Sequence, residues 1–487
     1  MGSRAYNFFS RFLRPIAVDT FLGNHSLDEV RQATVSLGKI AAPIAATKLL
    51  IFSRSIVSML FLTGLGKTDL AGGSLALAFA NITGYSVLKG LALGMEPICS
   101  QAFGAKKPSI LIQTYQKTLL CLLLICIPIS LLWLNMEPLF LRLGQDEGVV
   151  KVARACMVCF VPELFAQALL QPLRTFLRTQ RLMTPVTLAC LFAAVLHLPI
   201  NYLLVIHMDL RAKGVALALA WNSINTNLGL LAYLVISKKT LKPWQGRGIF
   251  LQNFRDWRWR PLLTLAVPSC AAVCLEWWWY DILLFLCSFL KNNSRASVSA
   301  MGIGIQIAGL FYTIPFALSS SLSTCIGHAL GGGHLCRAQV LSTVGITASI
   351  VLSFLTFIFM ITMRSALGRM YTSELEILNL ESIALPILGL CELAGSPQTA
   401  IYGVLAGTAR PDLEARIKLF SFYFIGMPVA ILLAFKWEYG FRGLWFGLLA
   451  SQISCVSMMA YTLMNMDWKQ QAKRAVKLTE AAVDKDD

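Results

Sequence analysis

Long apolar stretches constrain this chain more than any other feature. Its 487 residues are 56% hydrophobic and only 14% charged, whereas an average soluble protein is roughly 25% charged. The apolar residues fall in runs of about 20, the length that a helix needs to cross a hydrocarbon layer about 30 Å thick. The composition therefore excludes an ordinary globular enzyme, a disordered chain and a nucleic-acid-binding protein, and predicts an all-α polytopic membrane protein.

Hydropathy and helix-breaking residues divide the chain into twelve apolar stretches. They are predicted near 36–62, 72–98, 114–135, 152–172, 184–206, 213–236, 261–290, 299–326, 339–362, 378–404, 414–435 and 441–465. About 40 residues are then available for each transmembrane helix and its connection. This leaves no room for a separate soluble domain.

Lysine and arginine concentrate at the two termini and in alternate connections. Examples are Arg11 and Arg14; Lys106 and Lys107; Arg174, Arg178 and Arg181; Lys238, Lys239 and Lys242; Arg410, Arg416 and Lys418; and Lys469, Lys473 and Arg474. The other connections are poorer in positive charge and contain acids such as Glu374 and Glu376. Because positively charged connections stay in the cytoplasm, both termini are predicted to be cytoplasmic. The net charge of +17 then reflects topology and contact with anionic lipid.

The chain contains an internal duplication. The string CSQAFGAKK follows the second stretch and CIGHALGGG follows the eighth, with Gly104 aligned to Gly331 at an offset of 227 residues. Strings beginning at Gln171 and Gln398 repeat this offset. The offset is 225 between Pro43 and Pro268, and 229 between Lys213 and Arg442. Equivalent points are six stretches apart, so the halves have the same orientation and a pseudo-twofold axis along the membrane normal. Alternating-access transporters use this arrangement, with the substrate site between two lobes.

The duplication suggests a division of the chain into regions. We expect a cytoplasmic N-terminal segment at 1–34, an N-lobe at 35–237, a cytoplasmic linker at 238–260, a C-lobe at 261–466 and a cytoplasmic tail at 467–487.

The sequence lacks a nucleotide-binding loop that could power a pump. The nearest string, Gly66-Lys67-Thr68, has Phe61 where the phosphate-binding loop needs a glycine. Transport must then be driven by an ion gradient, and we expect no cofactor, no metal and no enzymatic activity.

Carboxyl groups inside apolar stretches are costly and are candidates for function. The deepest are Glu276 and Asp281 in CLEWWWYD and Glu392 in LGLCELAGSP. A carboxyl group removed from water binds a proton more readily, so such groups can exchange protons. On a helix Tyr280 shares a face with Glu276, whereas Asp281 stands about 140° around. We expect Glu276 to be the proton site between the lobes, and Asp281 to have either a structural or a functional role.

Other polar and aromatic residues are weaker candidates. Trp277, Trp278, Trp279 and Tyr280 could hold an organic cation by cation–π contact or could form a packing belt. Glu163 and Asn201 complete the candidate proton and substrate residues. His197, near Asn201, is more typical of packing. Lys48 and Arg54 would favour an anionic substrate if they face the cavity. The candidate gating residues are Glu96, Pro97, Gln101, His328, Pro43 and Pro268.

These residues and several longer strings resemble the multidrug and toxic compound extrusion (MATE) family, specifically its plant DETOXIFICATION branch. The matching strings include LAGGSLALAFANITGYSVLKGLALGMEPICSQAFGAK, QPLRTFLRTQ, CLEWWWYD, SIALPILGLCEL, GTARP and GLWFGLLASQ. The resemblance covers roughly residues 30–475. It implies a V-shaped pair of six-helix lobes and proton-coupled antiport of organic compounds. It also implies that acids matching Glu276, Asp281 and Glu392 bind the proton or cation.

Some positions depart from the family pattern. Where the family commonly has an Arg and an Asn-Glu pair after the eighth stretch, this chain has Cys325, His328 and Ala329, and Ala406 replaces the usual Arg before GTARP. These departures motivate an alternative, a transport-impaired membrane sensor or regulator of a cytoplasmic partner. A major-facilitator-type carrier is disfavoured, because its characteristic loop after the second stretch is missing.

The leading prediction is a monomeric secondary transporter for efflux of plant metabolites, xenobiotics or hormones. Its expected partners are a small organic substrate, protons and membrane lipid, with no nucleic acid. The plasma membrane and the endomembranes, including vacuole and Golgi, all stay open as its location.

Overall fold

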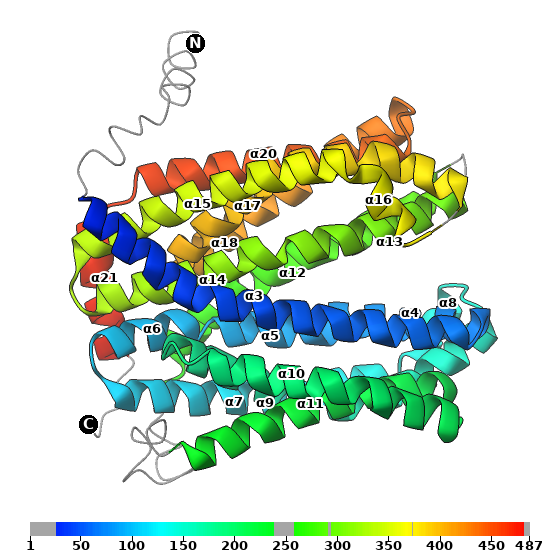
Figure 1. The fold of residues 1–487 in the computed structure, drawn as a ribbon, viewed down its shortest axis with the longest axis horizontal. Helices are drawn as coiled ribbons and strands as arrows, with labels where there is room; N and C mark the ends of the chain where they lie inside the picture. The colour runs from blue at the N-terminus through cyan, green and yellow to red at the C-terminus, as the bar shows by residue number, and fades with distance from the viewer. Residues whose placement is uncertain (1–25, 238–257, 291–293, 373, 482–487) are drawn as a thin grey trace.

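The computed structural model describes residues 26–237, 258–290, 294–372 and 374–481. These residues are helical, with no β-strand among them. The linker predicted at 238–260 lies almost entirely outside the described residues, as does most of the segment at 1–34. Figure 1 shows long, roughly parallel helices in two groups.

The first group is the N-lobe. Its elements are α3 (Leu27–Gly64), α4 (Lys67–Ala80), the π-helical turn η1 (Asn81–Tyr85), α5 (Ser86–Leu93), α6 (Glu96–Gly104), α7 (Pro108–Leu134), α8 (Glu137–Arg142), α9 (Glu147–Thr179), α10 (Thr184–Asn201), η2 (Tyr202–His207) and α11 (Arg211–Ile236). Local chemistry fixes where these helices begin. Ser26 and Glu29 form a reciprocal capping box before α3, and the Asp146 carboxylate accepts hydrogen bonds from the N–H groups of Gly148 and Val149 at the start of α9.

The second group is the C-lobe. Its elements are α12 (Arg260–Cys287), α13 (Ser294–Phe311), α14 (Thr313–Gly331), α15 (Leu335–Thr362), α16 (Arg364–Arg369), α17 (Leu375–Gly407), α18 (Pro411–Lys418), η5 (Leu419–Gly426), α19 (Met427–Ile431), η6 (Leu432–Lys436) and α20 (Phe441–Met464). The two groups confirm the predicted all-α fold of two six-helix lobes.

Eleven helical segments of the described residues are long and apolar enough to cross a membrane. They coincide with the predicted stretches except the one near 152–172. That stretch forms the middle of α9, which has 33 residues and carries several buried polar side chains, including Glu163, Gln167 and Arg178. A helix of this length is long enough to span the bilayer.

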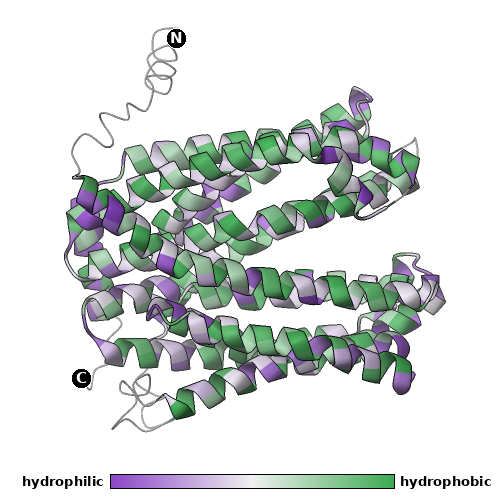
Figure 2. Ribbon diagram, viewed as in Figure 1, coloured by the Kyte–Doolittle hydropathy of each residue, from purple (hydrophilic) through white to green (hydrophobic). Residues whose placement is uncertain are grey.

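The outer surface of the lobes is apolar. Along α10, Leu188, Phe192, Val195 and Leu198 are exposed at helical spacing, and Figure 2 shows hydrophobic residues along the helices with hydrophilic ones concentrated near their ends. In water such a surface would aggregate. In a membrane it faces lipid, which explains why residues of this kind point outward.

The lobes meet at one end of the molecule, which we call the joined end; it is formed by α6, α14 and the helix α21 (Trp468–Ala481). In Figure 1 the lobes are close together there and separate toward the end where α8 and α16 lie. Glycines permit the close approach: a Cβ on Gly331 would lie 2.0 Å from the Gln101 carbonyl oxygen, and one on Gly104 would lie 2.3 Å from that of His328. Small residues at helix crossings are a common device in membrane proteins.

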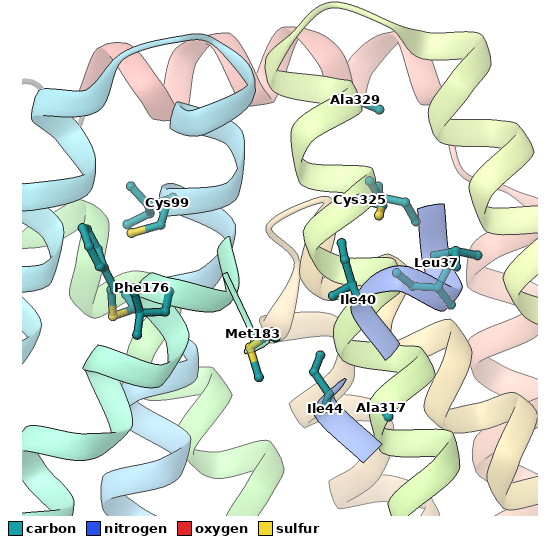
Figure 3. Packing of buried hydrophobic residues seen from close by; sticks show 14 of the residues in the cluster. Leu37, Ile40, Ile44, Cys99, Phe176, Met183, Ala317, Cys325 and Ala329 are labelled. Carbon is teal, nitrogen blue, oxygen red and sulfur yellow. The ribbon is translucent and has the colours of Figure 1, made fainter. Parts of the chain in front are cut away.

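A hydrophobic cluster at the joined end includes residues of both lobes. Cys99 and Phe176 come from the N-lobe, Ala317 and Cys325 from the C-lobe, and Figure 3 shows Ile40 of α3 among them. The Ser321 hydroxyl of α14 also donates to the Leu37 carbonyl of α3 at 2.8 Å. Helix α3 therefore links the two lobes.

The predicted tail at 467–487 contains a helix, α21 (Trp468–Ala481), which the sequence analysis missed. Trp468, Ala472, Ala475 and Leu478 pack on the cluster shared by both lobes, and the helix contacts α6 as well as α14 and α15. Residues 482–487 lie outside the described residues. The tail is therefore part of the joined end, where its apolar stripe covers both lobes.

Candidate functional site

An ion-pair chain lies inside the C-lobe. The Lys418 ammonium of α18 contacts a Glu276 carboxylate oxygen of α12 at 2.6 Å and a Glu414 oxygen of its own helix at 2.6 Å. The side chains of Lys418 and Glu414 are only 5% and 1% exposed, and that of Glu276 is 13% exposed. Two acids thus share one cation away from water, where charges need partners.

This arrangement corrects one sequence interpretation. The prediction that Lys418 lies in a positively charged connection is wrong, because this lysine is buried within the helical segment Pro411–Lys436. Glu414 was not among the predicted residues. The i, i+4 spacing of Glu414 and Lys418 was visible, but their partner Glu276 is 142 residues away from Lys418, and a single sequence does not reveal such a pairing.

Glu392 of α17 lies near the same chain. Its carboxylate accepts a hydrogen bond from Ser396 at 3.3 Å, and it is close enough to Glu276 and Tyr280 to interact electrostatically with both. Asp281 is different, because it forms no hydrogen bond or ion pair among the described residues. It interacts electrostatically with Tyr423 of η5. The structure brings Glu276, Glu392 and Tyr280 together and leaves Asp281 apart.

The aromatic run on α12 does not form a single cage. Trp279 is fully buried and packs edge-to-face on Phe422, whereas Trp277 and Trp278 are 41% and 37% exposed. The Trp278 indole N–H donates to the Ile82 carbonyl of the N-lobe at 3.2 Å. The Lys89 ammonium lies 4.4 Å from the Trp277 ring centre. A lysine of the protein therefore already lies over one face of the Trp277 ring.

The N-lobe holds its own polar network around Glu163. Its carboxylate accepts hydrogen bonds from the hydroxyl groups of Tyr85 at 2.9 Å and Ser223 at 3.3 Å. The Arg54 guanidinium lies 3.6 Å away, and Gln167 also donates to Ser223. Glu163 is only 2% exposed, and each of its partners comes from the same lobe.

Asn201 and His197 form a separate pair. The Asn201 amide donates to the His197 carbonyl at 2.8 Å and lies 3.1 Å from its ring nitrogen Nε2, which also contacts the Ser58 hydroxyl at 3.0 Å. Both Asn201 and His197 are buried. No hydrogen bond joins them to Glu163 within the described residues, so the structure does not bring Asn201 into the Glu163 network.

The predicted gating residues gather at the joined end. Glu96 pairs with Arg178 of α9 at 2.6 Å, both nearly buried, and Pro97 is buried beside it in the first turn of α6. The Gln101 side chain donates to the Gly407 carbonyl of the C-lobe at 2.9 Å. The Glu96 pair is internal to the N-lobe, whereas the Gln101 contact crosses between the lobes.

His328, one of the departures from the family pattern, makes a second contact across the lobes. Its Nε2 lies 2.7 Å from the Thr179 carbonyl oxygen, and its Nδ1 accepts a hydrogen bond from the Arg181 guanidinium at 3.2 Å. Its ring also lies 4.7 Å from that of Phe103, centre to centre. His328 thus makes polar contacts between the lobes.

The two repeated prolines lie inside helices that contact the other lobe. Pro43 is in α3, and its carbonyl accepts hydrogen bonds from Thr47 and Thr187. Pro268 is in α12, close to the point where Gly90 and Gly94 of the N-lobe meet this helix; a Cβ on Gly94 would lie 2.3 Å from Ala266 Cα.

Comparison with known proteins identifies relatives along nearly the whole chain. A family model described as MatE matches residues 43–203 and again 268–432. Protein DETOXIFICATION 53 of Arabidopsis thaliana is 54% identical over 457 residues, covering 94% of this chain and 93% of that protein. Protein DETOXIFICATION 48 of the same plant is 47% identical, covering 93% and 84%.

Solved structures agree with the fold. The eukaryotic MATE transporter AtDTX14 superposes with a TM-score of 0.87 at 27% identity, covering 93% of this chain and all of that one. A mutant of the Vibrio cholerae MATE transporter VcmN superposes with a TM-score of 0.76 at 18% identity, which supports the fold alone; it covers 93% of this chain and 99% of that one. The two model matches begin at 43 and 268, the positions of the prolines that defined one offset of the duplication. The chain belongs to the MATE family, multi-pass membrane proteins that act as secondary transporters of small organic substrates.

Proposed function

We propose that this protein exports an organic compound in exchange for protons, and that Glu276 and Glu392 are the proton sites. The observation that carries the proposal is the shared cation: Lys418 faces both Glu276 and Glu414 at 2.6 Å. With both acids ionised, the group formed by Glu276, Lys418 and Glu414 has one negative charge in excess. A proton can neutralise that excess charge without leaving a buried carboxylate unpaired.

Protonation of Glu276 would weaken its bond to Lys418 and so loosen α12 from α18. Helix α12 also crosses α5 of the N-lobe, where Gly90 approaches Cys270 closely enough that a Cβ would lie 2.5 Å from it. Cys270 is six residues from Glu276, about 9 Å along the helix. A change at Glu276 would thus be transmitted to the contact between lobes, which is what alternating access requires.

The driving force is sufficient for this exchange. A difference of one pH unit supplies about 1.4 kcal/mol per proton, equivalent to a tenfold substrate gradient for one-to-one exchange. Glu392 would extend the site, since it lies within electrostatic reach of Glu276.

Charge distribution supports an orientation in the membrane. Both termini are proposed to be cytoplasmic, on the basis of the positive-inside rule, and α21 is at the joined end. The joined end would then face the cytoplasm, and the lobes would separate toward the outside. The plasma membrane, vacuole and Golgi are all compatible with this orientation, and the protein is proposed to work as a monomer in contact with lipid.

Substitution of Glu276 tests the proposal. In inside-out vesicles, Glu276→Gln should abolish substrate uptake driven by a pH difference, while the variant still purifies as a folded protein. The matched control is Glu147→Gln, which removes an exposed acid whose partner is the surface residue Lys151; it should transport normally. Wild-type proton-driven uptake in Glu276→Gln would refute the assignment.

The regulator alternative is not favoured. It depended on the loss of polar gating groups, but His328 bonds across the lobes to Thr179 and Arg181. Transport by purified protein in liposomes discriminates between the two functions.

A further inference from the structure

Two lysines of the N-lobe face one aromatic ring of the C-lobe. The Lys48 ammonium of α3 lies 4.2 Å from the ring centre of Phe316 in α14, and that of Lys89 in α5 lies 5.1 Å from the same centre. Lys89 also lies over Trp277 of α12. Three inter-lobe contacts thus place two cations at a single point where the lobes face each other.

In the part of the chain that the structure describes, neither lysine has an acidic partner. Among the described residues, no carboxylate lies within salt-bridge distance of Lys48 or Lys89. Glu276 is close enough to influence Lys89 electrostatically, but it is already bound to Lys418. Both lysines contrast with Lys418, whose ammonium is held by two acids.

Other charges near Lys48 have the same sign. Lys89, Arg174 and Arg178 all act on it electrostatically. Arg178 is paired with Glu96, whereas Arg174 forms no ion pair in the described part of the chain and donates only to the Cys190 sulfur. Intramembrane cations without partners mark substrate or ion pathways, and here they are concentrated between the lobes.

We infer that Lys48 and Lys89, with Phe316 and Trp277, form the binding site for an organic anion with an aromatic or apolar body. The negative group would lie between the two ammonium groups and supply the partner that both lack. The body of the molecule would pack on Trp277, which is 41% exposed. The inference rests on the proposed function for a substrate route between the lobes, but the driving ion does not enter it.

The same geometry disfavours an organic cation as the preferred substrate. The protein's own ammonium groups already lie over the rings of Phe316 and Trp277, so part of the electrostatic attraction that these rings offer a cation is already used. An incoming cation would also be repelled by the two ammonium groups at short range. The lysines therefore set the charge of the substrate.

A matched pair of probes tests this. Purified full-length protein in nanodiscs of neutral lipid is dialysed against radiolabelled 1-naphthoate or 1-naphthylmethylammonium, which share a ring system and differ in charge. We expect the carboxylate to bind at least about tenfold more tightly. In Lys48→Met/Lys89→Met that affinity should fall by about tenfold or more, with the ammonium probe unchanged or bound more tightly. Lys48→Arg/Lys89→Arg should keep the preference.

The control is Lys39→Met, which removes an exposed lysine from the same helix as Lys48 and should bind both probes as wild type does. Equal binding of the two probes by the wild-type protein, preference for the ammonium, or no carboxylate binding overturns the inference, even where the methionine variants do not fold. The measurement uses no proton gradient. If Glu276 were not the proton site, the result of this binding measurement would therefore be unchanged. If the binding measurement contradicted the anion site, the assignment of Glu276 would still stand.

Discussion

Each lobe holds an acid in its fourth long helix, Glu163 buried and Glu392 half-buried, and the two environments differ. Glu163 of α9 accepts hydrogen bonds from Tyr85 and Ser223 and faces Arg54, a cation that does not lose its proton. Glu392 of α17 has one long hydrogen bond from Ser396 and lies near the Glu276–Lys418–Glu414 chain. In the N-lobe, Arg54 and two hydroxyl donors compensate the negative charge of Glu163. In the C-lobe, two acids share the single cation Lys418. This contrast supports our proposal that the C-lobe site exchanges a proton, whereas the N-lobe network keeps a fixed charge.

The largest effect is expected on removing the shared cation. Lys418→Met leaves Glu276 and Glu414 buried beside each other, and breaking a buried ion pair costs about 3–5 kcal/mol. Arg54→Met should cost less, about 2–3 kcal/mol, because Glu163 keeps its two hydroxyl donors. Denaturant unfolding in detergent measures both. Equal losses in the two variants would remove the distinction between the lobes.

Proton coupling is expected to depend on Glu276 of the C-lobe and not on Glu163 of the N-lobe. Glu163→Gln preserves the side-chain shape and one of the two acceptor oxygens. Because Glu163 is not proposed to exchange a proton, pH-driven transport should stay within about twofold of wild type. Glu276→Gln should lose at least about tenfold in the same vesicles. Uptake driven by a pH difference is the readout, with binding at fixed pH as the control for folding. A loss of coupling in Glu163→Gln comparable to that in Glu276→Gln would mean that the N-lobe acid also takes part in proton exchange, which contradicts the proposal.

The sequence allowed the architecture to be predicted, because each apolar stretch is a local property and the duplication repeats at a nearly constant offset. It also predicted Glu276 and Glu392 as candidate proton sites, since a carboxyl in an apolar stretch stands out by itself; that prediction stays untested. It did not identify Lys418 as the partner of Glu276, because that pairing joins helices distant in the chain. Lys89 escaped notice because hydropathy averages over a window, and one lysine in SVLKGLAL changes that average little. The helix α21 was missed, although its apolar residues recur at helical spacing.

A smaller effect is expected from a single hydroxyl in the N-lobe. Tyr85→Phe removes the 2.9 Å hydrogen bond to Glu163 and keeps the ring, which packs edge-to-face on Trp133. Hydrogen bonds to a charged group contribute about 1.5–3 kcal/mol, so unfolding should become easier by about that amount. Transport coupling should be unchanged. A variant as stable as wild type would mean that the remaining partners, Arg54 and Ser223, hold Glu163 without Tyr85.

The smallest effect is expected from the corresponding change in the C-lobe. Ser396→Ala removes the donor to Glu392 at 3.3 Å, a long hydrogen bond for a hydroxyl, and alanine retains helix propensity at this buried position. The loss of stability should therefore be about 0.5–1 kcal/mol, below that of Tyr85→Phe in the same unfolding measurement. If Ser396→Ala costs as much as Tyr85→Phe, Glu392 is held as firmly as Glu163. The contrast between a fixed and an exchangeable acid would then have to rest on Glu276 alone, where Lys418 is shared with Glu414.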